Sequence, residues 1–204
     1  MEFSKASEVE ANRHVHALFF AMTKEPLNGI RNLHPAYNTL TIDFDPLTIK
    51  PRDLEFKVQS LLEKTVHSSP SNALVKIPVS YGKESGPDLA EVSHLTGLSV
   101  SEVVSRHSKA EYTVAFLGFS PGFPYLLGLP RELSVPRLET PRLRVAAGSV
   151  AIAGEQAGIY PEFSPGGWRI LGRTDVKLFD LQRDPSVLLS PGDRVCFVPV
   201  GALP

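Results

Sequence analysis

The sequence predicts an α+β protein in which a small α/β domain at residues 1–70 is followed by a β-rich domain at residues 71–204. Helix and strand patterns mix in the first third of the chain. Of the 18 prolines and 15 glycines, 22 lie from Gly118 onward, among short β-prone segments. A polar stretch at residues 68–72 separates the two parts. A chain of 204 residues is long enough for two small domains, each with its own core.

Two helices and one strand are predicted in the first domain. The capping box Ser7-Glu8-Val9-Glu10 begins a helix that runs from about Ser7 to Lys24. Residues 37–44 alternate between polar and apolar positions, as in a half-buried strand. Pro51 suits the first turn of a second helix, and the apolar stripe of that helix consists of Leu54, Val58, Leu61, Leu62 and Val66.

The second domain begins with a predicted strand at residues 73–81 and two short helices at residues 87–95 and 99–107. Further β-prone segments follow at residues 112–119, 145–152, 168–172 and 195–200. Pro-Gly pairs at residues 121–122, 165–166 and 191–192 predict turns. Many short strands separated by such turns are typical of a β-barrel or a β-sandwich.

Composition excludes several classes of partner. The 21 basic residues are balanced by 22 acidic ones, whereas a nucleic-acid-binding protein normally has a basic surplus. No apolar run approaches the ~18 residues of a membrane span. The single cysteine, Cys196, excludes an internal disulfide and a cysteine-rich metal site, which fits a reducing compartment. We therefore expect a cytoplasmic protein without nucleic-acid or membrane partners.

Gly118-Phe119-Ser120-Pro121-Gly122 matches G-x-S-x-G, the nucleophile elbow of serine hydrolases. That elbow uses the backbone amide after the serine as an oxyanion donor, and Pro121 has no amide hydrogen. Pro121 and Pro124 also oppose the helix that must follow the elbow. We therefore do not expect Ser120 to act as a nucleophile.

Two further patterns favour ordinary structure over function. Residues 89–103 resemble a helix-turn-helix, but the second helix offers one arginine, Arg106, against Glu102, and a groove-reading helix needs several donors. A plain helical hairpin is the expectation. His14 and His16 lie two positions apart on the first helix, so they cannot form an i,i+4 metal-binding pair. No metal site is predicted.

A local cluster of arginines is interleaved with prolines, and it consists of Arg131, Arg137, Arg142 and Arg144. Guanidinium groups can hold a carboxylate or a phosphate through two parallel hydrogen bonds. The alternative is a solvated loop in which the arginines pair with Glu132 and Glu139. The glycine-rich segment at residues 164–168 lacks the Lys-Ser/Thr ending of a P-loop, so it predicts a pocket wall and no phosphate cradle.

The motifs between about residue 76 and residue 200 together resemble one protein family. They are Tyr81-Gly82, Gly86-Pro87-Asp88-Leu89, His107, Gly118-Phe119-x-Pro121-Gly122-Phe123-x-Tyr125-Leu126, Pro136-Arg137, Pro141-Arg142, Gly148-Ser149-Val150, Gly158-x-Tyr160-Pro161, Ser164-Pro165-Gly166-Gly167-Trp168, Gly172-Arg173-Thr174 and Pro191-Gly192-Asp193-x-Val195-x-Phe197. In this order and spacing they are similar to the family that includes the B subunit of prokaryotic 5-oxoprolinase, the kinase inhibitor KipI and allophanate hydrolase subunit 1.

The resemblance implies a ferredoxin-like α/β domain followed by a cyclophilin-like β-barrel. It also implies that the chain works with a homologous C subunit and a separate A subunit, and that the assembly cleaves 5-oxo-L-proline to L-glutamate. The family reaction consumes ATP with Mg²⁺, and the nucleotide is expected to be bound mainly by a partner protein of the complex. Two alternatives remain, namely a non-catalytic inhibitor of a sensor histidine kinase and a carboxyltransferase-like subunit of urea or allophanate metabolism.

The sequence departs from the family pattern at two places. Family chains carry an additional edge strand before the segment that matches Met1-Glu2-Phe3, so the first domain is expected to lack its first strand. An open sheet edge invites pairing, and we expect a partner or a second copy of the chain to cover it. Ser85 stands where the family has an aromatic or bulky residue.

The family resemblance also implies a set of site residues. His107 is expected to transfer a proton and Arg173 to act as a cationic donor in catalysis. Trp168 and Arg173 lie five positions apart on one predicted strand, so their side chains are expected on opposite faces. The alternative role for each aromatic ring is barrel core. The expected substrate-binding residues are Phe119, Pro121, Gly122, Phe123, Tyr125, Arg137, Arg142, Gly166, Gly167 and Trp168.

Overall fold

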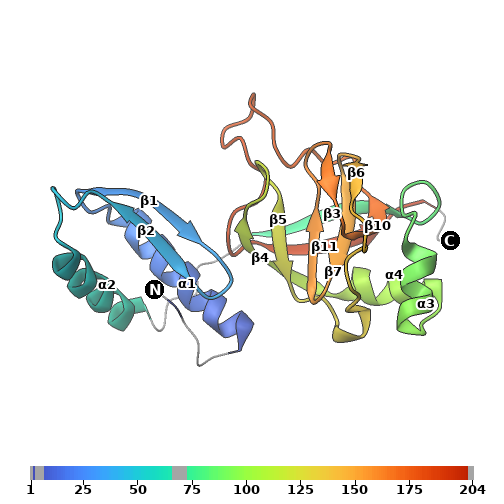
Figure 1. Cartoon of the computed structure of the whole chain (residues 1–204), viewed down its shortest axis with the longest axis horizontal. Coiled ribbons are helices and arrows are strands. Elements are labelled where there is room, and N and C mark those ends of the chain that lie inside the picture. Colours follow the sequence, from blue (N-terminus) through green and yellow to red (C-terminus); the bar gives the residue numbers. More distant parts are fainter. Residues whose placement is uncertain (1, 3–6, 66–72, 202–204) are drawn as a thin grey trace. The chain divides into compact units, whose positions relative to one another are not determined.

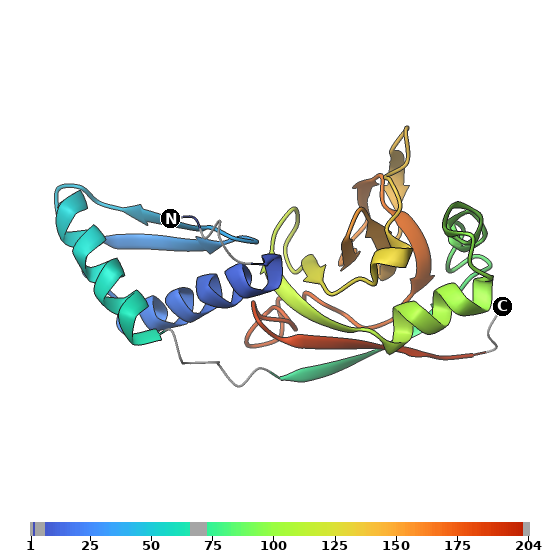
Figure 2. The ribbon, with the colours of Figure 1, turned by 90° about the horizontal axis from the view of Figure 1, so that it is seen from below.

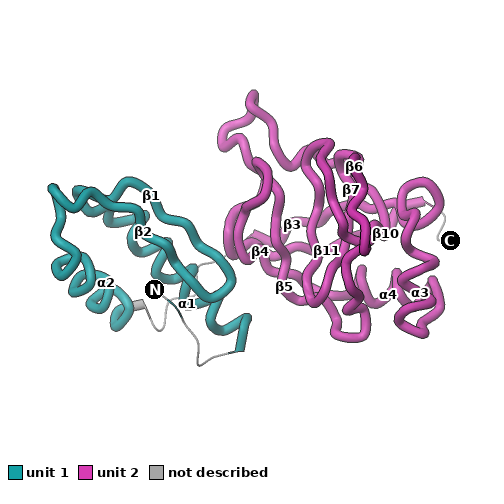
Figure 3. The backbone as a smooth tube through the Cα atoms, viewed as in Figure 1, with its two compact units in different colours: residues 1–72 teal, residues 73–204 magenta. Residues whose placement is uncertain are grey.

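The computed structural model describes residue 2, residues 7–65 and residues 73–201. Within the chain, two compact units are separated at residues 72 and 73, two positions after the expected boundary (Figure 3). Val66 of the predicted helical stripe and the polar stretch at residues 68–72 lie outside the described residues, as do Met1 and Phe3.

The first unit contains two helices and one antiparallel strand pair (Figure 1). In chain order these are α1 (Glu8–Lys24), β1 (Ile30–Pro35), β2 (Leu40–Phe44) and α2 (Pro51–Thr65). Ser7 accepts a hydrogen bond from the Glu10 amide, and the Glu10 carboxylate accepts one from the Ser7 amide, which confirms the capping box. Both helices pack on the same core, which includes Val15, Leu18, Leu40, Leu54 and Val58.

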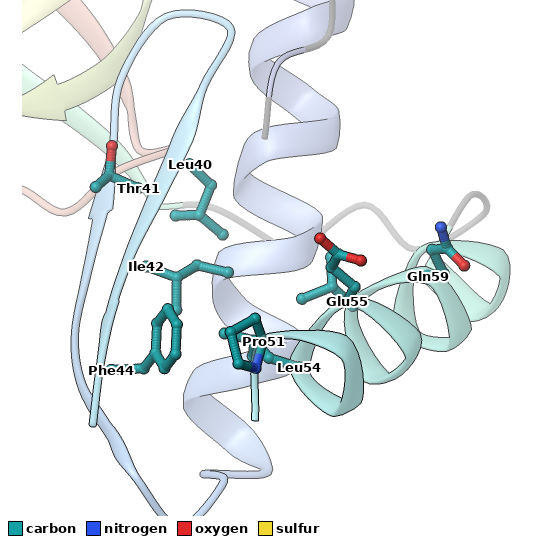
Figure 4. Close-up of a pocket in the computed structure, with 9 residues that line it drawn as sticks. Leu40, Thr41, Ile42, Phe44, Pro51, Leu54, Glu55 and Gln59 are labelled. Carbon is teal, nitrogen blue, oxygen red and sulfur yellow. The ribbon is translucent and has the colours of Figure 1, made fainter. Parts of the chain in front are cut away.

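Strand β1 was not predicted, because its alternation is interrupted by a bulge between Ile30 and Asn32. On the other side of β2, an isolated antiparallel bridge joins Glu2 to Thr39. Beyond that bridge, the described residues leave this edge of β2 unpaired. A groove of about 480 Å³ lies between β2 and α2 (Figure 4), and its lining includes Leu40, Ile42, Phe44, Leu54 and Val58.

The second unit is built on a closed seven-stranded barrel with the strand order β10-β3-β11-β4-β5-β8-β7. Strands β3 and β11 pair in parallel, and the other neighbours pair antiparallel. The barrel strands are β3 (Leu74–Tyr81), β4 (Glu111–Leu117), β5 (Pro124–Leu127), β7 (Ser149–Ala153), β8 (Gln156–Ile159), β10 (Arg169–Arg173) and β11 (Arg194–Pro199).

Three helices and a small ribbon accompany the barrel. Helices α3 (Leu89–Thr96) and α4 (Val100–Lys109) lie together at one side of it (Figures 1 and 2), and η1 (Arg131–Leu133) is a short 3-10 turn. Strands β6 (Arg142–Val145) and β9 (Ser164–Gly166) form a separate two-stranded ribbon. The helical hairpin and the α+β fold class, with a cyclophilin-like barrel, are thereby confirmed. Unit 1 has the order α-β-β-α, which is the central part of the β-α-β-β-α-β order of a ferredoxin-like domain; among its described residues both the first and the last strand of that order are absent.

Alternation along the strands produces two apolar clusters in the second unit. Val150 and Ile152 of β7 point to the barrel interior, while Ala151 and Ala153 point outward. The interior cluster also takes residues from α3 and α4. The outer cluster joins the outward residues to four aromatic side chains and to Val145 of the ribbon, and it is the basis of the candidate site.

Two predicted features were wrong. Residues 145–152 do not form one strand, because a turn ending at Gly148, with φ of +81°, separates β6 from β7. Pro165-Gly166 is not a turn either, since both residues belong to β9. Proline lacks an amide hydrogen, and a two-stranded ribbon with free edges tolerates it. No helix in the described part of the chain is long and apolar enough to cross a lipid bilayer.

Candidate functional site

The candidate site begins with a cluster of aromatic rings on the outer face of the barrel. The ring centroid of Phe123 lies 5.2 Å from that of Tyr160 and 5.6 Å from that of Trp168, and both pairs meet edge to face. Tyr125 packs against Trp168 at 5.8 Å and stacks on Phe116 at 4.5 Å. Phe123 and Trp168 are buried, whereas Tyr125 is partly exposed. The cluster thus presents its Tyr125 side to solvent.

Two glycines make room for these rings. A Cβ atom at Gly158 would lie 2.9 Å from ring carbons of both Phe123 and Trp168. A Cβ atom at Gly166 would collide with the Tyr160 hydroxyl oxygen. Gly167 is buried, and its carbonyl accepts a hydrogen bond from the Leu138 amide at 2.8 Å. The glycine-rich segment therefore holds aromatic rings and the arginine-rich loop together.

The loop between β4 and β5 places one exposed aromatic ring beside the cluster. Phe119 has a φ of +66°, a left-handed conformation that a non-glycine residue adopts only at a cost, and its side chain is 62% exposed. Its ring meets Phe123 at 5.4 Å and Tyr160 at 6.3 Å. Strand β5, and no helix, follows Pro121 and Gly122, so the loop is not a nucleophile elbow.

The arginine cluster is divided among different partners. The Arg137 guanidinium lies 5.7 Å above the Trp168 ring, and that of Arg144 lies 4.4 Å above the Phe163 ring. Arg142 donates from Nη2 to the Asp88 carboxylate at 2.6 Å. Glu132, expected as a local partner, instead binds Arg106 at 2.9 Å. Arg137 and Arg142 are therefore the two arginines that accompany the aromatic cluster.

Asp88 is a site residue that the sequence reasoning missed. Its side chain is buried, and its carboxylate accepts hydrogen bonds from Arg142 and from the Ile170 amide, the latter at 2.7 Å. It thereby links the start of α3 to β10 and to the ribbon. Asp88 belongs to the Gly86-Pro87-Asp88-Leu89 motif, but nothing in its spacing indicated a partner 54 positions away.

Electrostatics keep the Tyr160 hydroxyl protonated. Burial raises the pKa of this phenol, and the Trp168 amide and the positive charges of Arg137 and Arg142 oppose that rise only in part. A neutral hydroxyl remains able to donate a hydrogen bond. The arrangement of two guanidinium groups, a phenol and aromatic walls suits a small planar ligand that carries one negative charge.

His107 does not join this cluster. It is fully buried on α4, where its Nδ1 atom lies 2.8 Å from the Tyr81 hydroxyl and its ring stacks on Phe197 at 4.6 Å. Burial lowers the pKa of His107 to about 3, so the imidazole is neutral at physiological pH. The expectation of a proton-transfer group within reach of substrate is corrected, because the ring is part of the barrel interior.

Arg173 is exposed at the end of β10, while Trp168 is buried just before the strand begins. A bulge between Ile170 and Gly172 interrupts this strand. The Arg173 guanidinium makes no hydrogen bond or ion pair with the described residues. The structure therefore does not bring Arg173 and His107 together. Across the described ranges, no group of three or more histidine, cysteine, aspartate or glutamate side chains is arranged to hold a metal ion.

Comparison with known sequences places this geometry in a family. The model of the carboxyltransferase domain, subdomain C and D, matches residues 1–189. The chain is 47% identical over 165 residues to the 5-oxoprolinase B subunit of Escherichia coli O157:H7, with 81% of this chain and 76% of the relative covered. The Bacillus subtilis (strain 168) protein of the same name is 37% identical, and the match covers 97% of this chain and 87% of that relative. These relatives confirm the resemblance found in the motifs.

Solved structures show the same fold. TTHA0988 superposes with a TM-score of 0.87 at 40% identity, covering all of this chain and 40% of that chain, so this chain spans less than half of TTHA0988. PH0987 from Pyrococcus horikoshii is 42% identical and superposes with a TM-score of 0.62. The match covers 98% of this chain and 92% of PH0987. The Kluyveromyces lactis urea carboxylase is 20% identical and superposes with a TM-score of 0.74. The match covers 98% of this chain and 20% of the carboxylase chain, and at this identity it shows the fold alone. The chain belongs to the family of the carboxyltransferase domain, subdomain C and D.

Proposed function

We propose that the chain is the B subunit of an ATP-dependent 5-oxoprolinase, which cleaves 5-oxo-L-proline to L-glutamate together with the A and C subunits. The observation that carries the proposal is the group formed by Arg137, Arg142, Tyr160 and Trp168 on the outer face of the barrel. It places two cationic donors for a carboxylate beside an aromatic cluster whose Tyr125 and Phe119 rings reach solvent. The curated relatives, which are named as B subunits of 5-oxoprolinase, support the same substrate.

The chemistry requires a source of energy and a second set of groups. The lactam of 5-oxoproline is an unstrained amide, and its hydrolysis is uphill near neutral pH, so the reaction is coupled to ATP hydrolysis. The segment at residues 164–167 runs into β10 and not into a helix N-terminus, so it does not fit a P-loop nucleotide site. We assign Mg²⁺-dependent ATP binding mainly to a partner protein of the complex.

In this assignment the residues of the chain bind and orient the substrate. Arg137 and Arg142 hold negative charge, and Trp168, Phe123 and Tyr125 exclude water from the ring. Phe119 is exposed in a left-handed conformation, at the position where a partner protein would complete the pocket. The isolated chain is therefore expected to have no turnover.

Reconstitution tests the proposal. The full chain is mixed with the purified A and C subunits, 5-oxo-L-proline, ATP and Mg²⁺, and glutamate release is measured with each component omitted in turn. Release is expected only from the complete mixture. Turnover by the chain alone would contradict the shared pocket. A complete mixture that releases no glutamate, combined with inhibition of a sensor histidine kinase by the chain, would favour the inhibitor role.

A matched pair of variants tests the site within the active complex. Arg137→Ala removes the guanidinium above Trp168 and is expected to raise KM for 5-oxoproline about tenfold or more, the effect of one charged hydrogen bond. Arg131→Ala removes an exposed arginine on η1 that does not accompany the aromatic cluster, and it is expected to leave KM unchanged. Equal effects of the two substitutions would show that only general positive charge matters.

A further inference from the structure

The ribbon of β6 and β9 has an inner and an outer face. Arg142 pairs with Gly166 and Val145 pairs with Ser164, so three steps on β6 match two steps on β9. This bulge turns Leu143 and Arg144 outward and keeps Arg142 and Val145 on one face with Ser164 and Gly166. Exposure agrees, since Leu143 is 92% exposed and Val145 is 1% exposed.

The inner face packs against the aromatic cluster. Val145 is buried in one cluster with Tyr160 and Trp168, and the Tyr160 hydroxyl occupies the space that a side chain at Gly166 would fill. Arg142 is the cross-strand partner of Gly166, and Ser164 lies two positions before Gly166, so both residues share the inner face on which that hydroxyl lies. Arg144, on the outer face, lies over Phe163 instead.

Two polar atoms on this inner face have no partner among the described residues. One is Nη1 of Arg142, whose Nη2 is bound to Asp88, and the other is Oγ of Ser164. Both atoms are buried from solvent. A buried donor left without an acceptor destabilises the folded protein, and the cost is larger when the donor is charged. Two such donors on one face indicate an acceptor that bridges them.

We propose that Arg142 Nη1 and the Ser164 hydroxyl, together with the Tyr160 hydroxyl, form a carboxylate-binding subsite in which Asp88 positions Arg142. A carboxylate supplies two acceptor oxygens, one for the guanidinium and one for a hydroxyl. The charge also fits, because Arg137 and Arg142 carry two positive charges and Asp88 carries one negative charge. The remaining single positive charge suits a monoanion better than a phosphate dianion.

The subsite rests on the proposed function, in which its ligand is the carboxylate of 5-oxo-L-proline. Asp88 is a positioning residue, since it contacts Arg142 and the Ile170 amide. Its effect should appear in KM and not in kcat, because it orients a binding group away from the lactam bond.

Binding to the full chain is measured first, by the fluorescence of Trp168, the single tryptophan of the sequence. The probes are 5-oxo-L-proline, its carboxylate-free analogue 2-pyrrolidinone, L-glutamate and inorganic phosphate. Where the chain alone gives no signal with 5-oxo-L-proline, the same series is measured as KM and inhibition constants in the reconstituted complex. Ser164→Ala is expected to weaken the binding of 5-oxo-L-proline about tenfold and to leave the binding of 2-pyrrolidinone unchanged. Arg142→Lys keeps the charge but loses the planar guanidinium with its paired N–H donors, so it is expected to weaken the binding of 5-oxo-L-proline at least as much.

Three further variants separate the subsite from general stability. Asp88→Asn is expected to raise KM with kcat retained, whereas Arg144→Lys on the outer face is expected to change neither. Ser164→Asp places a carboxylate beside Arg142 within the chain, so it should abolish 5-oxo-L-proline binding while the melting temperature holds or rises. That last result does not depend on the identity of the natural ligand.

The outcomes are distinct. A complex that does not cleave 5-oxo-L-proline refutes the proposed function, while the Ser164→Asp melting temperature still tests the subsite. A complex that cleaves it with unchanged KM in Ser164→Ala and Arg142→Lys overturns the subsite alone. Equal weakening of 2-pyrrolidinone and 5-oxo-L-proline also overturns it, and tighter binding of phosphate than of either carboxylate shows a phosphate site instead.

Discussion

Acidification should destabilise the barrel unit through His107. The folded protein keeps this imidazole neutral, because burial lowers its pKa from 6.5 to about 3. The unfolded chain takes up the proton near pH 6.5. Between these two values the unfolded state binds more protons than the folded state, so the free energy of unfolding falls as the pH falls.

The magnitude follows from the two pKa values. Each pH unit within the window between them is worth about 1.4 kcal/mol. Lowering the pH from 7 to 5 crosses about 1.5 units of that window, which corresponds to a loss of about 2 kcal/mol from this residue. Above pH 7 the neutral His107 makes its full contribution to the free energy of unfolding, and below pH 3 that contribution is lost entirely.

Urea denaturation of wild type and His107→Gln at pH 7, 6 and 5 measures this contribution, with Trp168 fluorescence reporting on the barrel unit. The glutamine side chain has both a carbonyl and an amide group, so it can form a hydrogen bond with the Tyr81 hydroxyl in either direction, and it does not titrate in this range. The variant should be less stable at pH 7 and should lose about 2 kcal/mol less between pH 7 and pH 5. Equal losses in the two proteins would refute the reasoning, because the folded protein would then protonate His107 readily, and a proton-transfer role would again be open.

Three further substitutions have defined outcomes. Ser120→Ala should leave the activity of the reconstituted complex nearly unchanged, since Pro121 has no amide hydrogen to stabilise an oxyanion. A loss of ~100-fold in kcat would show that Ser120 acts as a nucleophile after all. Arg173→Lys should leave the melting temperature unchanged, because Arg173 makes no ion pair with the described residues, and should raise KM if its guanidinium binds substrate; unchanged kinetics would remove it from the site. Gly158→Ala should cost about 1–3 kcal/mol in urea denaturation, because the new Cβ would lie 2.9 Å from two rings; an unchanged midpoint would show that the rings move freely.

The sequence predicted those elements whose signals are local. The capping box at Ser7–Glu10 spans only four positions, and it located the start of α1 to within one residue. Strand β1 was not predicted because a bulge interrupts its alternation. The end of β6 and most of β7 were predicted as one strand because the turn at Gly148 is surrounded by β-prone residues. Pro165 looked like a turn because the ribbon that contains it is visible only in three dimensions.

The candidate site was predicted only in part, for the same reason. Phe123, Tyr125 and Trp168 lie in dense motifs, and the structure brings them together. The pairing of Arg142 with Asp88 crosses 54 positions, so spacing could not reveal it. His107 carries a titratable ring in the sequence, but its burial depends on Tyr81, Tyr112 and Phe197 from three separate strands. A local pattern shows which residue types are present, and only packing decides which of them solvent can reach.

The pairing of β3 with β11 has a consequence for how the protein is made. Strand β3 opens the barrel unit, and β11, its parallel neighbour, is the last strand of that unit. During synthesis β3 and β4 therefore wait for a neighbour that leaves the ribosome after the other strands of the barrel unit, and closure is a late event with a high contact order. Until then both strands present hydrogen-bonding edges to other nascent chains. Ribosomes that stall before residue 194 should release a barrel unit that cannot close and that aggregates, because the strand that joins β3 to β4 is missing.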